Sequence, residues 1–262
     1  MIKTRTDGTT TRSITAYGHY ALALASTVLG CFMMFFDEFA SVWQPVPDGL
    51  PMRSILAYIY GAIFVLSGLL SLSKSYRKQG NIGIALAFGL DAIALHLPRI
   101  IGSPLVFNFW SSFGEQIAVA SAAVTLVTEG DSRFATLRTC SILVFGTSVL
   151  GFGAAHFIYL DQTAKMVPHA FTPHLFWATA TGMCHIAAGI AILSGLFRRT
   201  ALWLLTMMCL MFGILVHLPS LIEDYKNHFW WFGNAVNFTL VAATWVFADA
   251  EQMLIMRRRQ SK

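Results

Sequence analysis

Charged residues and cysteines are scarce in this sequence. Only 12% of its 262 residues are Asp, Glu, Lys or Arg, against 56% hydrophobic residues, whereas about 25% of the residues of a soluble domain are charged. No C-x-x-C pair joins the four cysteines, which argues against a disulfide scaffold, a zinc finger and a thioredoxin-like dithiol. Signatures for nucleotide, flavin or iron–sulfur binding are also lacking. We therefore expect a membrane protein.

Uncharged runs of about 20 residues, the length that crosses a bilayer as a helix, are abundant. Six runs contain no Asp, Glu, Lys or Arg, and two further apolar runs each contain one carboxylate, Asp91 or Glu115. The sequence predicts an all-α polytopic protein with eight transmembrane helices. The predicted spans are Ile14–Phe36, Ser54–Ser73, Gly80–Pro98, Phe107–Thr128, Thr139–Leu160, Leu175–Leu196, Thr200–Ile222 and Phe229–Ala248.

The basic residues indicate how these spans are oriented, because cytoplasmic loops carry the excess of Lys and Arg. Of the 18 Lys and Arg residues, 14 lie in the two termini and in alternate loops. We therefore expect both termini on the cytoplasmic side of the membrane. The net charge of +5 then reflects topology, and we expect no nucleic-acid partner. The four basic residues on the other side are Arg53, Arg99, Lys165 and Lys226.

An internal duplication is the second organising feature. At an offset of 121 residues, 18 of the 83 positions in 28–110 match those in 149–231 without a gap, including His96-Leu97-Pro98 with His217-Leu218-Pro219. The sequence predicts two four-helix repeats of the same orientation, related by a pseudo-twofold axis along the membrane normal. The expected organisation is a tail at 1–13, a diverged first repeat at 14–128, a linker at 129–138, a second repeat at 139–250 and a basic tail at 251–262.

The second repeat resembles the DoxX/DoxD-like family of bacterial membrane proteins. The residues that carry the resemblance are Gly151, His156, Val167-Pro168, Thr181-Gly182, His185, Gly189, Arg198-Arg199 and His217-Leu218-Pro219. The resemblance implies a four-helix unit and, for some members, a role as the membrane subunit of a thiosulfate:quinone oxidoreductase or as a partner in redox-stress complexes. It thus implies a quinone-linked redox protein of the bacterial inner membrane that works with a partner subunit.

Four polar side chains within the spans are the candidate catalytic residues, because ionisable groups in lipid are costly and typically functional. His156 and His185 occur only in the second repeat, where the first has Phe35 and Phe64. Asp91 and Glu115 occur only in the first. We expect Asp91 to be protonated, paired with a histidine or an arginine such as Arg99, or wetted by a cavity. Our hypothesis is that the two carboxylates meet the two histidines at the repeat interface and relay protons from a quinol.

Two residue pairs are candidates for cofactor binding. His96 and His217 each stand two residues before a proline, which predicts that the helix ends there at the outer surface. Trp110 and Trp231 belong to an aromatic belt at that surface, where a flat slot would also suit a quinone ring. Binding of haem or of a metal ion is not excluded by the sequence, although no span has the H-x-x-x-H spacing that places two ligands on one helix face.

Two functions remain open on the sequence alone. One is the quinone-linked redox protein. The other is a non-enzymatic membrane accessory or small-molecule-binding subunit of a larger complex, whose interior polar residues fix helix packing. A transporter is less favoured, because paired Gly or Pro residues do not visibly interrupt the spans.

Overall fold

A computed structural model describes residues 16–260, and the predicted tail at 1–13 lies outside the described residues. Helices make up 83% of the structure, and no strand occurs among the described residues. The all-α prediction is therefore confirmed. The elements of the N-terminal half are α1 (Gly18–Phe36), η1 (Ser41–Trp43), α2 (Arg53–Leu72), α3 (Arg77–Leu90), η2 (Asp91–His96), α4 (Leu97–Gly102) and α5 (Phe107–Val127).

The C-terminal half has a similar order of elements. They are η3 (Ser132–Phe134), α6 (Ala135–Ile158), α7 (Leu160–Met166), α8 (His174–Ser194), α9 (Arg198–Phe212), η4 (Gly213–His217), α10 (Leu218–Glu223) and α11 (His228–Gln260). The basic segment 251–262 is predicted as a tail, but α11 continues to Gln260. Charged residues at the end of an apolar helix can reach water while its backbone bonds continue, so the end of the apolar run does not mark the end of the helix.

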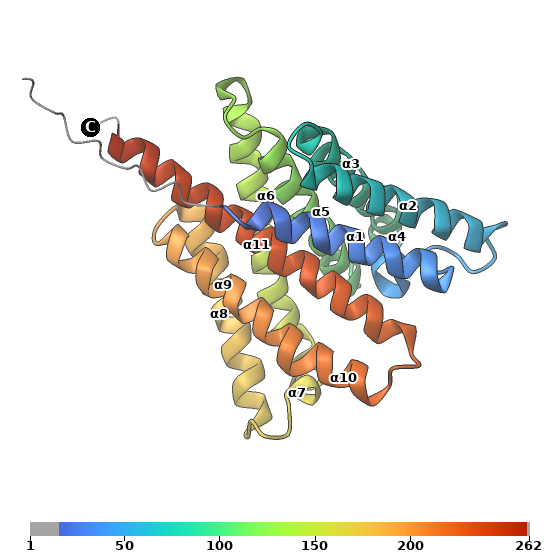
Figure 1. The fold of residues 1–262 in the computed structure, drawn as a ribbon. Helices are drawn as coiled ribbons and strands as arrows, with labels where there is room; N and C mark the ends of the chain where they lie inside the picture. Colours follow the sequence, from blue (N-terminus) through green and yellow to red (C-terminus); the bar gives the residue numbers. More distant parts are fainter. Residues whose placement is uncertain (1–15, 261–262) are drawn as a thin grey trace, which may run out of the picture.

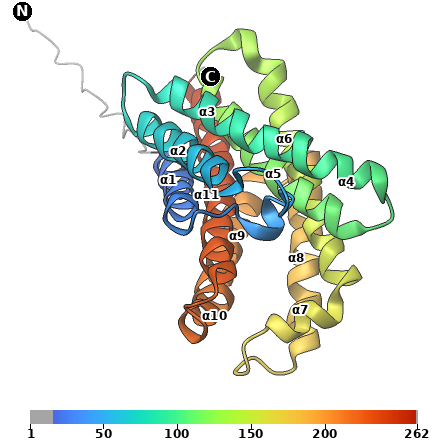
Figure 2. The same ribbon diagram turned by 90° about the vertical axis from the view of Figure 1, so that its right-hand side faces the viewer.

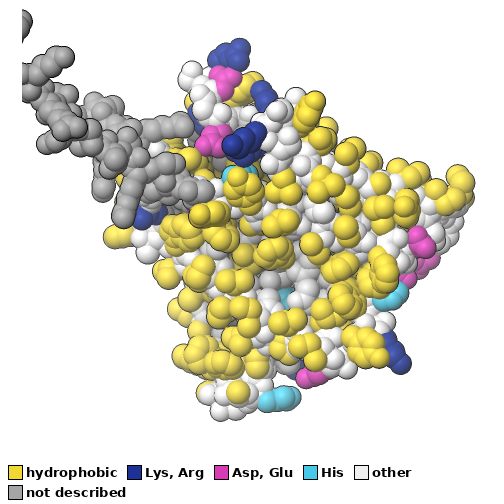
Figure 3. Space-filling model, in the orientation of Figure 1, with side chains coloured by type: hydrophobic (Ala, Val, Ile, Leu, Met, Phe, Trp, Pro, Cys, Tyr) yellow, Lys and Arg dark blue, Asp and Glu magenta, His cyan; other side chains and the backbone are white. Residues whose placement is uncertain are grey.

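Seven helices among residues 16–260 are long and apolar enough to cross a membrane. They are Gly18–Phe36, Arg53–Leu72, Arg77–Gly102, Ser132–Ile158, His174–Ser194, Arg198–Glu223 and His228–Met256. In Figure 3, hydrophobic side chains cover the middle of one face, and most of the charged side chains in view lie towards its edges. Such a surface fits a lipid bilayer, and the helices are those of a multi-pass membrane protein.

The two halves pack through the same kinds of neighbours. Within the N-terminal half α1 contacts α2, α2 contacts α3, and α3 contacts α5. Within the C-terminal half α6 contacts α8, α8 contacts α9, and α9 contacts α11. The halves join where α5 meets α6 and where α1, the first helix, lies against α11, the last (Figures 1 and 2). A closed bundle results, with α5 and α11 also in contact.

The prediction that the two His-Leu-Pro sequences end helices is wrong. A π-helical turn, η2 or η4, carries the helix through each one into the short helices α4 and α10. Each turn closes with a bond to the carbonyl five residues earlier, from Leu97 N–H to Ala92 and from Leu218 N–H to Gly213. The wider turn helps the helix to accommodate a proline that has no N–H to donate.

Four loops lie at one end of the bundle, which we call the cap end: 37–52, 103–106, 159–173 and 224–227. The opposite, linker end holds 73–76, 128–134 and 195–197. The loop at 37–52 folds back against the bundle, because its short helix η1 contacts both α5 and α11. The interior side chains described next are arranged around this segment.

Candidate functional site

Two consecutive residues of the first cap loop hold the two ends of the π-helical turn η2. Gln44 Nε2 donates to Asp91 Oδ2 at 2.9 Å, and the carbonyl oxygen of Trp43 lies 2.9 Å from His96 Nε2. A carbonyl oxygen only accepts, so His96 Nε2 carries the hydrogen. Gln44, Asp91 and His96 are all buried. The loop and the turn therefore form one buried polar unit.

Asp91 has neutral hydrogen-bond partners. Besides Gln44, the hydroxyl of Tyr60 lies 2.9 Å from Asp91 Oδ1, and the same hydroxyl donates to the carbonyl oxygen of Ala87 at 2.8 Å. Among residues 16–256, whose side chains the structure describes, no Lys, Arg or His forms an ion pair with Asp91. The guanidinium of Arg99, a predicted partner, lies instead 4.4 Å from the ring centre of Phe109.

Glu115 on α5 is the chain neighbour of Gln116, which also bonds to the loop of this buried polar unit. Its neighbour Gln116 donates from Nε2 to the Trp43 carbonyl oxygen at 2.7 Å, so that this oxygen accepts from both Gln116 and His96. Glu115 Oε2 is buried and has no hydrogen-bond partner among the described residues. The same holds for His96 Nδ1 and Gln116 Oε1. Several buried polar atoms near the Trp43 segment thus lack a partner.

His156 and His185 lie together in the other half. Their ring centres are 4.8 Å apart, and each Nδ1 bonds to a carbonyl one turn earlier in its own helix, Phe152 at 2.8 Å and Thr181 at 3.0 Å. The Phe212 ring lies almost parallel to both imidazoles, with centres 6.2 and 6.0 Å away. Phe212 is the residue that corresponds to Asp91 at the offset of 121. The histidine pair is therefore next to the position that holds the carboxylate in the first half.

The structure thus brings the two candidate histidines together and does not join them to the carboxylates. No hydrogen bond or ion pair links Asp91 or Glu115 to His156 or His185 within residues 16–260. In the same part of the chain, no group of three or more His, Cys, Asp or Glu side chains is placed to hold a metal ion.

The paired cofactor candidates have similar local structures. The indole N–H of Trp110 donates to the carbonyl of Pro104, and that of Trp231 to the carbonyl of Tyr225, each at 2.9 Å and six residues back. His217 resembles His96 in having a buried Nδ1 without a partner among the described residues, and it differs in that its own carbonyl oxygen accepts from Asn234 Nδ2 at 2.9 Å.

Trp231 of this set borders a groove. A groove of about 690 Å³ at the cap end lies between α1 and the start of α11. Its aromatic lining consists of Phe32, Phe35, Phe36, Tyr225 and Trp231, and its other lining residues are Cys31, Lys226 and His228. We call it the aromatic groove. His228 stacks on Phe36 at 3.9 Å between ring centres and lies 3.1 Å from Glu38 Oε2.

Sequence reasoning did not find Gln44, Tyr60 or Gln116. Gln44 lies in a loop and Tyr60 in an apolar run, where neither residue type stands out. The available signal was the isolated Asp91, which required a partner from another element. Comparison with known protein families found no matching family model, and neither the curated proteins nor the solved structures gave a significant match.

Proposed function

We propose that this chain is a quinone-linked membrane redox protein of the DoxX/DoxD type, which works with a protein partner. The observation that carries the proposal is the aromatic groove. Phe32, Phe36 and Trp231 offer flat apolar faces for a ring, since aromatic rings stack favourably. Lys226 and His228 are hydrogen-bond donors in the same groove, and a quinone has two carbonyl oxygens that accept hydrogen bonds.

The location of the groove agrees with a lipid-soluble ligand. Cys31, Tyr225 and Lys226 are exposed, and Phe35 is 81% exposed, so the groove opens on the surface of the apolar bundle. A quinone that takes up two electrons also takes up two protons to become the quinol. In this proposal the electrons come from the partner subunit. A groove near the cap end would allow the ligand to enter from the bilayer.

A matched pair of tryptophans tests this function. The protein would be purified in lipid nanodiscs, and bound quinone would be extracted and quantified. Trp231→Ala should lose the quinone, while Trp110→Ala should keep it, because Trp110 makes the same kind of indole bond outside the groove. Wild-type protein without quinone, or equal losses in the two variants, would contradict the proposal.

The proposed membrane architecture has eight spans in two parallel repeats, with both termini in the cytoplasm. Its support is the repeated neighbour pattern, the paired π-turns and the paired indole bonds described above. The eighth span is α5, a helix of 21 residues that contacts α3, α6 and α11. Reporter fusions at residues 105 and 130 test it. The fusions should report opposite sides of the membrane, and the same side for both would exclude α5 as a span.

A non-enzymatic accessory subunit is the second candidate. It is favoured by the way His156 and His185 are used, because each Nδ1 bonds to its own helix backbone. Close packing accompanies them, since a Cβ on Gly182 would come within 2.8 Å of His156 Cβ. Such residues can serve helix packing alone. In that case the His156→Ala and His185→Ala variants would change stability and leave quinone reduction in membranes unchanged.

A further inference from the structure

The hydrogen bonds of Asp91 identify where its proton lies. Gln44 Oε1 accepts the N–H of Ala40 at 2.9 Å, which fixes the Gln44 side chain so that its Nε2 faces Asp91. An amide nitrogen only donates, so Asp91 Oδ2 acts as an acceptor. If the carboxyl group carries a proton, that proton therefore lies on its other oxygen, Oδ1.

The contact on Oδ1 favours a protonated acid. The Tyr60 hydroxyl has one hydrogen and two oxygen neighbours, Asp91 Oδ1 at 2.9 Å and the Ala87 carbonyl at 2.8 Å. Because the carbonyl only accepts, a hydroxyl that donates to Ala87 needs a donor on its other side. Oδ1–H supplies that donor. The resulting chain runs from Asp91 to Tyr60 to Ala87.

Among the side chains that the structure describes, none carries a charge that pairs with an ionised Asp91. The side chain is 3% exposed, and an unpaired charge in such a place is costly. Arg53 lies 3.7 Å from Asp48, Arg99 lies over Phe109, and His96 bonds to Trp43. The charged and titratable groups on the helices around the turn are Arg53, Tyr58 and Tyr60 on α2, Arg77 and Lys78 at the far end of α3, Glu115 on α5, His96 and Arg99.

We propose that Asp91, Tyr60 and Gln44 form an interior proton-binding site, with the proton on Asp91 Oδ1 and with Gln44 of the first cap loop as its cover. On release, Oδ1 loses the proton to a water molecule that enters at the cap end. Tyr60 then turns its hydroxyl hydrogen from Ala87 to Oδ1, and the Ala87 carbonyl keeps its bond from the Asp91 N–H. Gln44 has to move aside for this water, so the loop controls the exchange. The site does not depend on whether the aromatic groove binds a quinone.

An asparagine substitution distinguishes the protonated from the ionised form of Asp91, because the amide resembles the neutral acid in shape and, like it, has both a hydrogen-bond donor and an acceptor. Asp91→Asn should keep the thermal unfolding temperature of the wild type in detergent, whereas Asp91→Ala should lower it. Infrared spectra of the same proteins should show that Asp91→Asn loses one carboxylic-acid C=O band. Loss of a carboxylate band instead, or equal destabilisation by Asn and Ala, would overturn the proposal.

The roles of Tyr60 and Gln44 are tested on the same band. Tyr60→Phe removes the acceptor of the Oδ1 hydrogen and should shift the band to higher frequency, while Tyr58→Phe, on the exposed side of the same helix, should leave it in place. Gln44→Ala should speed hydrogen–deuterium exchange of the acid by about tenfold, which corresponds to one strong net hydrogen bond. The exposed control Gln79→Ala should not change it. An unshifted band in Tyr60→Phe, or unchanged exchange in Gln44→Ala, would overturn the assignment.

Discussion

Gln44 and Asp91 are 47 residues apart in the chain and are joined by a hydrogen bond of 2.9 Å in the interior of the bundle. The bond connects a loop to the start of a π-helical turn. The adjacent loop residue, Trp43, connects through its carbonyl to His96 at the other end of that turn. Irregular backbone at membrane depth persists where protein groups satisfy it. The first cap loop is therefore part of the core of the first half.

The first prediction concerns His96. His96→Ala removes one of the two donors to the Trp43 carbonyl and leaves a cavity in place of the fully buried imidazole ring. We expect a loss of about 1–3 kcal/mol in the free energy of unfolding, the cost of a broken buried hydrogen bond. Chemical unfolding in mixed micelles measures it. His169→Ala, at an exposed loop position, should change the value by less than about 0.5 kcal/mol. Equal effects would contradict the role of the loop.

The second prediction uses a pair of glycines at the offset of 121. A Cβ on Gly30 would overlap the carbonyl oxygen of Gly61 and come within 2.8 Å of Phe64 Cβ, whereas a Cβ on Gly151 would have nothing within 4 Å. Overpacking costs about 1–3 kcal/mol, so Gly30→Ala should lower the unfolding temperature. Gly151→Ala should keep or raise it, because alanine is the better helix former. Thermal unfolding of both variants in detergent measures the two unfolding temperatures. A lower temperature for Gly151→Ala than for Gly30→Ala would show that α1 and α2 do not meet here.

Hydropathy was sufficient to predict most of the helices. The uncharged runs around Leu29, Gly61 and His185 all lie in long helices, because crossing a bilayer demands length and apolar composition, and both are visible in the sequence. The predicted helix ends at Pro98 and Pro219 were wrong. A proline rule considers only the regular α-helical bond pattern, and the π-turns at η2 and η4 replace that pattern.

The candidate site was predictable only in part. Gly182 and Gly189, three residues before and four residues after His185, share its helix face, and small residues at that spacing predict that the histidine points into the bundle. His185 is indeed 3% exposed. The partners of Asp91 were not predictable. Gln44 reaches it only because the loop at 37–52 folds back against the bundle, which is a tertiary contact without periodicity. Tyr60 was counted among the apolar residues of its run, although its hydroxyl is the polar group that Asp91 needs.

The third prediction concerns the meeting point of the first and last helices. Asp249 Oδ2 on α11 accepts the backbone N–H of Gly18 at 2.7 Å, one of the unsatisfied donors at the start of α1. Asp249→Ala should therefore destabilise the protein by about 0.5–2 kcal/mol, as the loss of a helix cap does. Amide hydrogen exchange in the first turn of α1 should become faster. Glu129→Ala, at an exposed position near the same end, is the control, and equal exchange in the two variants would contradict the capping role.

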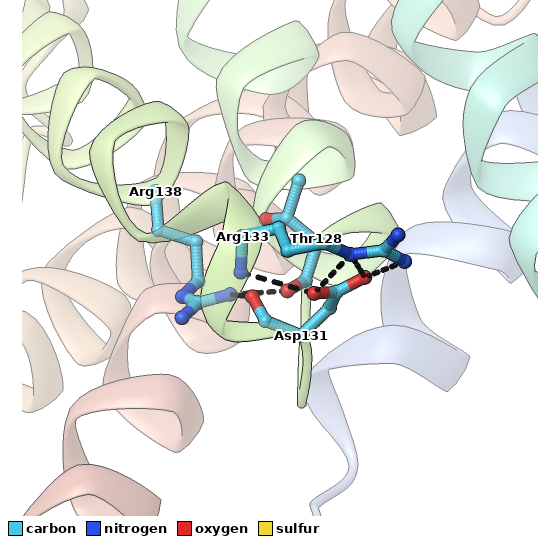
Figure 4. Close-up of polar contacts among 4 residues, drawn as sticks. All are labelled: Thr128, Asp131, Arg133 and Arg138. Atoms are coloured by element: carbon cyan, nitrogen blue, oxygen red, sulfur yellow. Dashed lines mark hydrogen bonds and ion pairs between the residues drawn. The ribbon is translucent and has the colours of Figure 1, made fainter.

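The last prediction concerns the linker, where two arginines act differently (Figure 4). Arg133 Nη2 and Nε lie 2.7 and 3.2 Å from Asp131 Oδ2, and its backbone N–H donates to Oδ1 at 3.0 Å. Arg138 instead donates from Nη1 to the carbonyl oxygens of Thr128 and, at 2.8 Å, of Asp131. The first contact depends on an ionised carboxylate, and the second on carbonyls that do not titrate.

The side-chain hydrogen bonds from Arg133 lower the pKa of Asp131 below its ordinary value. A carboxyl pKa that is lower in the folded state stabilises above the unfolded pKa of about 3.9, and this stabilisation is lost as the pH falls through the folded value. Asp131→Asn should therefore unfold at a lower temperature than the wild type at pH 7 in low salt, and we call this difference the gap. The gap should close below about pH 4, and it should shrink in 1 M salt because the Arg133 side chain is 82% exposed. Arg138→Ala should lower the unfolding temperature at both pH values and depend less on pH than Asp131→Asn, because the charge of Arg138 is only a minor cause of the lowered pKa of Asp131. A gap for Asp131→Asn that persists at low pH would show that the ion pair does not act in the linker.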